Sequence, residues 1–199
     1  MVSYFLAAAL VQIEVRTSYD ANRKVAGHIA DGRSIERARE CIGKMPGFSA
    51  TDSNGKAISL WGLRGKPVVI FFLDKDCPCC VSGKLYVDRI QAAYGKNASV
   101  IGFMTGSIRA QAWIKKNRPT FRIVLDPGNK VAMTYRAEVG MACRVLDKNG
   151  KILLSYPGYS AAMLQFVGDT VAKEAGIKPK KLNTFPAPEE LTSGCPLIR

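Results

Sequence analysis

The stretch GKPVVIFFLDKDCPCCVSGK, residues 65–84, decides how the rest of the chain is interpreted. Its first half is a continuous apolar run rich in β-branched and aromatic side chains, which is typical of a central strand buried on both faces. Its second half places three of the six cysteines of the chain, Cys77, Cys79 and Cys80, within four positions. The order is therefore a strand, a cysteine, Pro78 and then a segment with a helical apolar pattern.

This order has a chemical meaning. In open parallel sheets, functional groups collect beyond the carboxyl ends of the strands, and a helix that starts there stabilises a thiolate with its free N–H groups and the positive end of its dipole. Pro78 suits the first helical turn, where no N–H is needed. Cys77 and Cys80 are one turn apart, so we expect a redox pair in which Cys77 is the exposed partner.

Metal binding and inert packing of the cysteine cluster both stay open beside redox chemistry. Cys77, Cys79 and Cys80, with Cys143 as a further thiol, offer soft ligands to Cu(I) or Zn²⁺, although their spacing is poor for a tetrahedral zinc site. Alternatively, the three thiols pack the start of a helix without any chemistry, as buried free cysteines often do. Three cysteines at the exposed end of a strand are not a core pattern, so redox chemistry is favoured.

Alternating strands and helices surround this stretch. We expect strands over 65–73, 98–104 and 121–126, helices over 77–94, 107–117, 130–135 and 160–176, and β-hairpins with Asn-Gly turns over 46–60 and 142–156. This order predicts one α/β domain, residues 45–176, with a mainly parallel sheet flanked by helices and an antiparallel edge from the second hairpin.

Two flanking segments complete the chain. Residues 1–44 hold an apolar segment and a charged, helix-compatible lead-in. Residues 2–15 are short for a bilayer span, so three interpretations stay open: a membrane anchor in the cell envelope, an incomplete export segment, and a helix packed on the domain. A location in the cell envelope is preferred, with a cytoplasmic location as the alternative. Residues 177–199 form a flexible, Pro-rich extended tail, on which Cys195 is expected to be solvent-exposed, although the tail is long enough to return it to the site as an extra resolving thiol.

The remaining composition excludes some classes of function. Lys and Arg number 29 against 16 Asp and Glu, a formal net charge of +13, but the basic residues are scattered and lack interleaved aromatic side chains. Nucleic-acid binding is therefore not expected. Ordinary structural roles are predicted for five further residues: interior packing for Cys41, Cys143, Trp61 and Trp113, and a surface position for His28.

The segment 45–175 resembles the thioredoxin-fold redoxins, the group that contains the AhpC/TSA-type peroxiredoxins and the TlpA/ResA-type thiol-disulfide oxidoreductases. PGFSATDSNGKAISLWGLRGKPVVIFF, residues 46–72, is similar to the opening of that family, DCPCC stands at the place of its WCPPC-like motif, and residues 121–152 are similar to its later core. The resemblance implies a thioredoxin-like fold and thiol–disulfide exchange, with Cys77 attacking and Cys80 resolving. It implies no bound organic cofactor, and a protein dithiol or disulfide as the partner.

The site departs from the family pattern in three respects. Met141 stands at the place of the family's cis-proline, which faces the active-site cysteines and contacts the substrate backbone. Asp76 precedes Cys77 where an aromatic residue is common, and a carboxylate there opposes thiolate formation. A third thiol lies inside the motif, so four residues are treated as auxiliary: Cys79, Met141, Cys143 and Cys195.

A peroxiredoxin-like thiol peroxidase is the alternative that the same resemblance offers. Such enzymes usually hold the peroxide with a Thr or Ser three positions before the reactive cysteine and with an arginine. Here Asp74 stands three positions before Cys77, and Arg144 is not at the expected offset. Dithiol exchange is therefore preferred to peroxide reduction.

Overall fold

The computed structural model describes residues 27–106 and 110–197. Its strands are β1 (His28–Ile29), β2 (Ser49–Asp52), β3 (Ala57–Ser59), β4 (Val68–Asp74), β5 (Ser99–Thr105), β6 (Arg122–Asp126), β7 (Cys143–Leu146), β8 (Ile152–Tyr156) and β9 (Thr192–Ser193). Its helices are α1 (Gly32–Arg39), the 3-10 helix η1 (Trp61–Leu63), α2 (Pro78–Tyr94), α3 (Ala110–Asn117), α4 (Lys130–Thr134) and α5 (Ala161–Ala175). Residues 2–15, with the predicted anchor or packed helix, lie outside the described residues, and within these no helix is long and apolar enough to cross a bilayer.

The main sheet has seven strands in the order β3-β2-β6-β5-β4-β7-β8. β4 pairs in parallel with β5, and β5 with β6, so the centre of the sheet is parallel. The hairpin of β7 and β8 extends it antiparallel beside β4, and the hairpin of β2 and β3 forms the other edge. Both predicted hairpins and the mixed α/β sheet are thus confirmed, but only the β4–β5 and β5–β6 pairings are parallel and the other four are antiparallel, so the sheet is less parallel than predicted.

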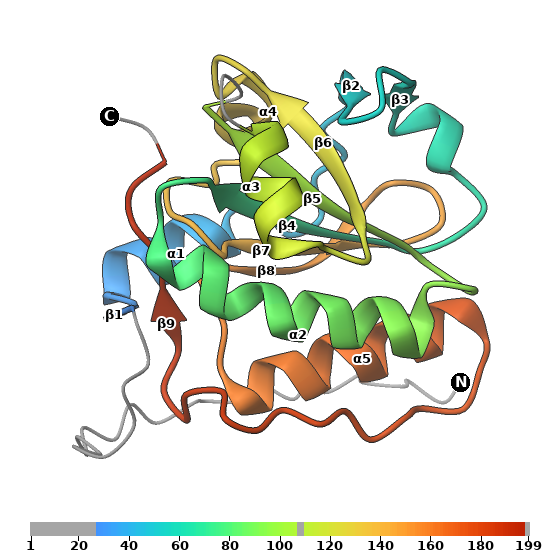
Figure 1. Ribbon diagram of the computed structural model, residues 1–199. Helices are drawn as coiled ribbons and strands as arrows, with labels where there is room; N and C mark the ends of the chain where they lie inside the picture. Colours follow the sequence, from blue (N-terminus) through green and yellow to red (C-terminus); the bar gives the residue numbers. More distant parts are fainter. Residues whose placement is uncertain (1–26, 107–109, 198–199) are drawn as a thin grey trace, which may run out of the picture.

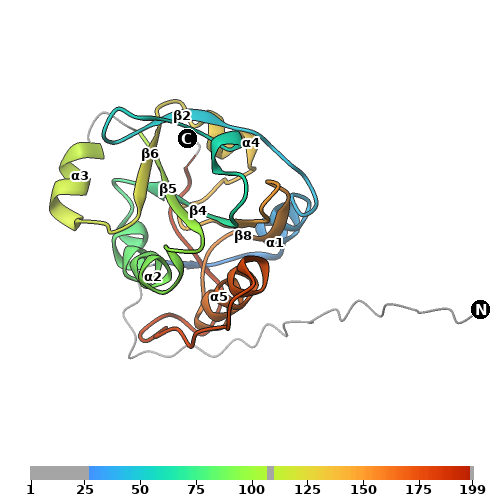
Figure 2. The same cartoon turned by 90° about the vertical axis from the view of Figure 1, so that its right-hand side faces the viewer.

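Helices cover both faces of this sheet (Figure 1). α2 and α5 lie side by side on one face, where their apolar side chains share a core cluster with those of β4 and β7. Figure 2 shows α4 on the opposite face. There the rings of Phe72 and Phe103 stack with their centroids 5.6 Å apart, and Tyr135, which follows α4, packs on Phe72. The two clusters bury every side chain of β4 from Val68 to Leu73, as the uninterrupted apolar sequence predicts.

α2 begins immediately after β4, as predicted. Pro78 is its first residue, and Cys77 is its N-cap, with the extended backbone angles φ −88° and ψ 113°. Only Lys75 and Asp76 separate Cys77 from the end of the strand. Cys77 therefore lies at the carboxyl edge of the sheet, next to the free N–H groups at the start of a helix of 17 residues.

The position of Trp61 differs from the one predicted from the sequence. Trp61 was predicted to be buried, but it is 74% exposed. It lies on the short helix η1 at the surface, where the guanidinium of Arg64 stacks 4.0 Å from the centroid of its ring. This cation–π contact gives the indole a partner without burial. Trp113 is buried and His28 is exposed, as predicted.

The tail after α5 is extended, as predicted, but it is packed against the domain. Leu182, Ala187 and Leu197 are buried, and the Lys180 N–H donates to the Tyr94 hydroxyl at 2.9 Å. Figure 1 shows the tail returning along α5 and α2 to the end where α2 begins. There β9 pairs antiparallel with β1. The prediction of a flexible tail is therefore wrong for the described residues.

A buried arginine ties the β7–β8 hairpin to the segment after α4. Arg144 is almost fully buried. Its guanidinium nitrogens donate five hydrogen bonds, all to backbone carbonyl oxygens at 2.9–3.2 Å, on Tyr135, Arg136, Cys143 and Tyr156. These bonds use all the donors of the guanidinium, so Arg144 has a structural role.

Replacement of this arginine tests that role. Arg144→Met retains most of the side-chain volume but leaves buried carbonyl groups without donors, which costs about 1–3 kcal/mol for each group that finds no other partner. We expect the free energy of unfolding, measured by urea denaturation, to fall by about 2–4 kcal/mol. The exposed Arg33→Met on α1 is the control and is expected to change it by less than ~0.5 kcal/mol. Equal effects of the two substitutions would contradict the assignment.

Candidate active site

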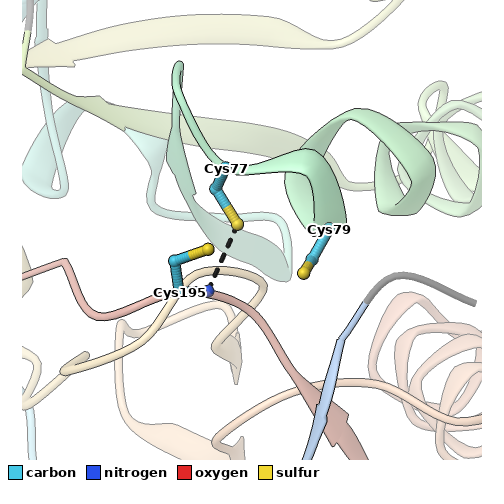
Figure 3. A group of neighbouring side chains, drawn as sticks. All are labelled: Cys77, Cys79 and Cys195. Atoms are coloured by element: carbon cyan, nitrogen blue, oxygen red, sulfur yellow. Dashed lines mark hydrogen bonds between the residues drawn. The ribbon is translucent and has the colours of Figure 1, made fainter.

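Four of the six cysteines meet where α2 begins. Cys77, Cys79 and Cys80 come from the start of this helix, and Cys195 comes from the tail (Figure 3). The sulfurs of Cys77, Cys79 and Cys195 all lie within 4.8 Å of one another, and the Cys80 thiol hydrogen-bonds to Cys77. All are free thiols. The pair at Cys-x-x-Cys spacing and the tail cysteine therefore form one group of sulfurs.

Cys77 is the acidic member of this group. Its Sγ accepts the backbone N–H of Cys195 at 3.2 Å, which Figure 3 marks as a dashed line. The hydrogen bond from the Cys80 thiol, together with that backbone N–H and against the effect of burial, lowers the pKa of Cys77 from 9.0 to about 5. A thiol with such a pKa is a thiolate at neutral pH and is thus ready to act as a nucleophile.

The other three thiols hold their protons. The hydrogen bond to Cys77, and then burial, raise the pKa of Cys80 well above 9.0, although its Sγ also accepts the Asp74 N–H at 3.3 Å. Burial and the nearby charge of Cys77 raise the pKa of Cys79 to about 12, and the hydrogen bond to Cys77 raises that of Cys195. One negative charge is thus localised on one sulfur.

The accessibility of Cys77 corrects the sequence analysis. Cys77 was predicted to be the exposed partner, but its exposed fraction is 0%. The tail covers it, since Cys195 contributes the bond described above, and the loop at Gly140 closes in from the other side: a Cβ there would lie 2.8 Å from the Cys80 sulfur and 3.4 Å from that of Cys77. Cys195 itself is half-buried, so the prediction of a solvent-exposed tail cysteine is also wrong.

Asp76, which was expected to oppose thiolate formation, does not prevent it. Its carboxylate forms an ion pair with the ammonium of Lys75 on the surface. The neighbouring positive charge and solvent screen it from the thiolate. The pKa of Cys77 accordingly lies below its ordinary value in spite of this neighbour.

Met141, at the place of the family's cis-proline, belongs to the same core cluster as Cys77 and Cys80. Its backbone is left-handed, with φ 64°, and its N–H donates to the carbonyl oxygen of Phe72 at 2.7 Å. Neither feature is open to proline, which fixes φ near −65° and has no N–H. The side chain fills the space above Gly83 of α2, where a Cβ would lie 2.4 Å from the methionine Cε.

The two remaining cysteines pack in the interior. Cys143 on β7 is fully buried, and burial raises its pKa, which makes it a poor nucleophile. Cys41 lies in the core cluster of the opposite face, where its thiol donates to the carbonyl oxygen of Tyr135 at 3.5 Å. Both positions agree with the packing role predicted from the sequence.

Sequence reasoning missed one side chain beside the sulfurs. The hydroxyl of Tyr159 is buried and has no hydrogen-bond partner among the described residues. Burial raises the pKa of this phenol, and the proximity of Tyr86 and of the sulfurs of Cys79, Cys80 and Cys77 raises it further. The phenol is therefore a protonated donor next to the reactive group. A lone tyrosine after a hairpin carries no sequence signal of such a place.

The sulfur cluster also resembles a soft-metal ligand set in one respect. The three sulfurs that the structure gathers within 4.8 Å are those of Cys77, Cys79 and Cys195, whereas the sequence analysis considered Cys80 in place of Cys195. Metal ligation requires deprotonated thiols. Of these three thiols only Cys77 has a lowered pKa, so a metal that bound all three would have to displace the protons of Cys79 and Cys195.

Comparison with known proteins agrees with this architecture. Chloroplastic peroxiredoxin Q from Gentiana triflora is 31% identical over 121 residues, which cover 56% of this chain and 56% of that protein. Thiol-disulfide oxidoreductase ResA from Bacillus cereus is 27% identical over 130 residues, covering 64% of this chain and 73% of that protein. The peroxiredoxin Q relatives from Gentiana triflora, Sedum lineare and Populus jackii are matched over 56–65% of their own length.

A solved structure and the family profile complete the comparison. A candidate protein disulfide isomerase from Bacteroides thetaiotaomicron has a TM-score of 0.59 and 25% identity, covering 65% of this chain and 89% of that chain. The AhpC/TSA family profile matches residues 43–155, which extend from before β2 into β8 and include the cysteines that begin α2. With its thioredoxin-like fold, the chain belongs to the AhpC/TSA family.

Proposed function

We propose that the protein is a thiol–disulfide oxidoreductase in which Cys77 attacks and Cys80 resolves. The observation that carries this proposal is the unequal protonation of two neighbouring sulfurs: the pKa of Cys77 is lowered to about 5, and that of Cys80 is raised by its hydrogen bond to Cys77. A dithiol of this kind has its nucleophile ready and its second thiol protonated.

The reaction proceeds in two exchanges. The Cys77 thiolate attacks one sulfur of a partner disulfide, forms a mixed disulfide and releases the other partner sulfur as a thiolate. Cys80 then loses its proton and attacks the Cys77 sulfur, so that the Cys77–Cys80 disulfide forms and the partner leaves as a dithiol. The partner gains two electrons, the protein loses two, and the reverse sequence oxidises a partner.

The position of the tail supports the order of attack. Cys77 and Cys80 are both fully buried, but the sulfur of Cys77 lies against the tail, where it accepts the Cys195 N–H at 3.2 Å. The sulfur of Cys80 accepts a backbone N–H from Asp74 at 3.3 Å. A partner that displaces the tail therefore meets Cys77 first, and Cys80 reacts from inside the protein.

A thiol peroxidase is the second candidate, because the chain is similar to peroxiredoxin Q. The residues argue for exchange instead. Asp74 stands where a hydroxyl is expected, and the donors of Arg144 are all used by backbone carbonyl groups. Arg144 therefore has no free donor with which to hold a peroxide beside Cys77.

Single cysteine substitutions test the proposed pair. We expect Cys77→Ser to reduce dithiothreitol-driven insulin reduction to the uncatalysed background, since the nucleophile is lost. Cys80→Ser leaves attack intact but prevents resolution, so a covalent mixed disulfide with the substrate is expected on a non-reducing gel. The control, Cys41→Ser on the opposite face, is expected to keep wild-type activity. Peroxide consumption that requires Cys77 and not Cys80 would select the peroxidase, and tightly bound copper or zinc would select the metal site.

The charge on Cys77 makes a second, pH-dependent prediction. Thiolates absorb at 240 nm, so the absorbance of the reduced protein is expected to rise with a midpoint near pH 5, the lowered pKa of Cys77. Because the folded-state pKa lies below the ordinary 9.0, the thiolate stabilises the fold fully above pH 9 and loses this effect as the pH falls through 5. Cys77→Ser is expected to abolish the step, and a step that persists in this variant would contradict the assignment.

A further inference from the structure

The end of the tail is paired with the loop before Met141 as an added β-strand. Residues 138–140 and 194–197 run antiparallel, with a bridge between Val139 and Pro196. Three backbone hydrogen bonds of 2.8 Å join the two segments: Gly140 N–H to Cys195 O, Gly194 N–H to Gly140 O, and Leu197 N–H to Glu138 O. Strand addition is a common way in which proteins bind extended peptides, with backbone bonds for affinity and pockets for alternate side chains.

The two segments approach more closely than side chains would allow. A Cβ on Gly194 would lie 2.9 Å from the backbone of Gly140. A Cβ on Gly158 would lie 2.2 Å from the Thr192 carbonyl oxygen, beside the N–H and C=O that Thr192 exchanges with Tyr159 at 2.9 Å. Two contacts of the tail thus require glycine, one at Gly194 against Gly140 and one at Gly158 against Thr192, so the tail is closely fitted to the domain at both places.

This pairing places Cys195 next to the sulfur of Cys77. The Cys195 N–H donates to the Cys77 sulfur at 3.2 Å, and the two sulfurs lie within 4.8 Å of each other. A disulfide requires a separation of about 2.05 Å. Both side chains point into the space between α2 and the tail (Figure 3), and formation of the bond requires these side chains to turn toward each other.

We propose that the segment Thr192–Leu197 is an internal substrate of the site. It occupies the docking groove of an extended cysteine peptide along Glu138–Gly140, and its Cys195 exchanges disulfides with Cys77. The partner class that follows is an extended segment in which glycine precedes the cysteine, because Gly194 is the residue that the groove admits next to Cys195. This inference rests on the proposed function of Cys77 and Cys80.

The exchange is balanced without any other reactant. In the oxidised protein, the Cys195 thiol loses its proton, and its sulfur attacks the Cys77 sulfur of the Cys77–Cys80 disulfide. The Cys77–Cys195 bond forms, the Cys77–Cys80 bond breaks, and the Cys80 thiolate takes up a proton. No electrons enter or leave the protein. A partner thiol or disulfide reaches Cys77 only after it displaces the tail.

Trapping of the disulfides tests the chemical part. The full chain is oxidised with glutathione disulfide and quenched with acid, and its cysteine pairs are mapped by mass spectrometry. We expect both the Cys77–Cys80 and the Cys77–Cys195 pairs in the wild type, only the second in Cys80→Ser and only the first in Cys195→Ser. Cys41→Ser is the control and is expected to match the wild type.

The outcomes separate the two proposals. Formation of the Cys77–Cys80 pair in the wild type, with no Cys77–Cys195 pair even in Cys80→Ser, overturns the internal substrate and leaves the proposed function intact. Absence of every pair that contains Cys77 overturns both. A Cys77–Cys195 bond found only between two chains, as a covalent dimer on a non-reducing gel, also overturns the internal substrate.

A second experiment tests whether the docked tail limits access to Cys77. Gly194→Val places side-chain atoms against the Gly140 backbone and is expected to open the tail, so that Cys77 reacts with 5,5′-dithiobis(2-nitrobenzoate) about tenfold faster or more, as the open population grows. Gly47→Val is the control, because a Cβ at this exposed glycine would meet no atom within 4 Å, and it is expected to leave that rate within about twofold of the wild-type rate. Circular dichroism shows that each variant is folded. Equal rates in the wild type and Gly194→Val would overturn the docked tail.

The same variant tests the partner class. The peptide TSGCPL, activated as its mixed disulfide with 2-nitro-5-thiobenzoate, is offered to the Gly194→Val protein beside the peptide TSVCPL. We expect the glycine peptide to react with Cys77 about tenfold faster, because the groove has no room for a side chain before the cysteine. Equal rates would overturn the glycine requirement.

Discussion

The hydrogen bond from the Cys195 amide to the Cys77 sulfur joins the tail to the start of α2. It couples a charge to a conformation, because the same backbone N–H that stabilises the thiolate belongs to the strand that covers it. The largest stabilisation comes from the Cys80 thiol, whose sulfur also accepts the Asp74 amide, and the Cys195 thiol and the Cys80 N–H add to it. If the tail leaves, the thiolate therefore loses part of its stabilisation at the moment when it becomes reachable, whereas the contribution of Cys80 remains.

The parts of the fold that depend on side-chain pattern could be predicted from the sequence. The buried strand β4, the helix α2 with Pro78 at its start and the two Asn-Gly hairpins all follow from apolar periodicity and turn chemistry. The docking of the tail could not be predicted in this way, because its buried side chains are widely spaced and its end is held by backbone bonds at Gly140 and Gly194. Such contacts leave no hydrophobic period. For the same reason the sequence analysis expected Cys77 to be exposed and preferred an exposed Cys195, with its return to the site as the alternative.

Met141, which the sequence analysis placed at the position of the family's cis-proline, lies next to the contact between Gly140 and the tail. Met141 donates its N–H to Phe72 and adopts a left-handed backbone, so the preceding Gly140 turns both its N–H and its C=O to the tail. A left-handed conformation is uncommon for a residue with a side chain, and such conformations persist where the surroundings over-determine them. The methionine side chain is held against Gly83 of α2, which ties the geometry of the docking loop to the helix that carries the reactive cysteines.

Acidity and accessibility are separate controls on the reactivity of a thiol, and this protein combines them in opposite directions. The lowered pKa of Cys77 makes the thiolate abundant at neutral pH, so a further decrease would not increase the amount of nucleophile. Its complete burial makes reaction depend on the fraction of molecules in which the tail is open. A partner that pairs with Glu138–Gly140 gains the backbone bonds that the tail gives up and so opens the site at little net cost. A small disulfide gains no such bonds, and the full opening free energy slows its reaction. Selectivity for extended cysteine peptides over small thiol reagents thus follows from the cover and does not require a specific pocket.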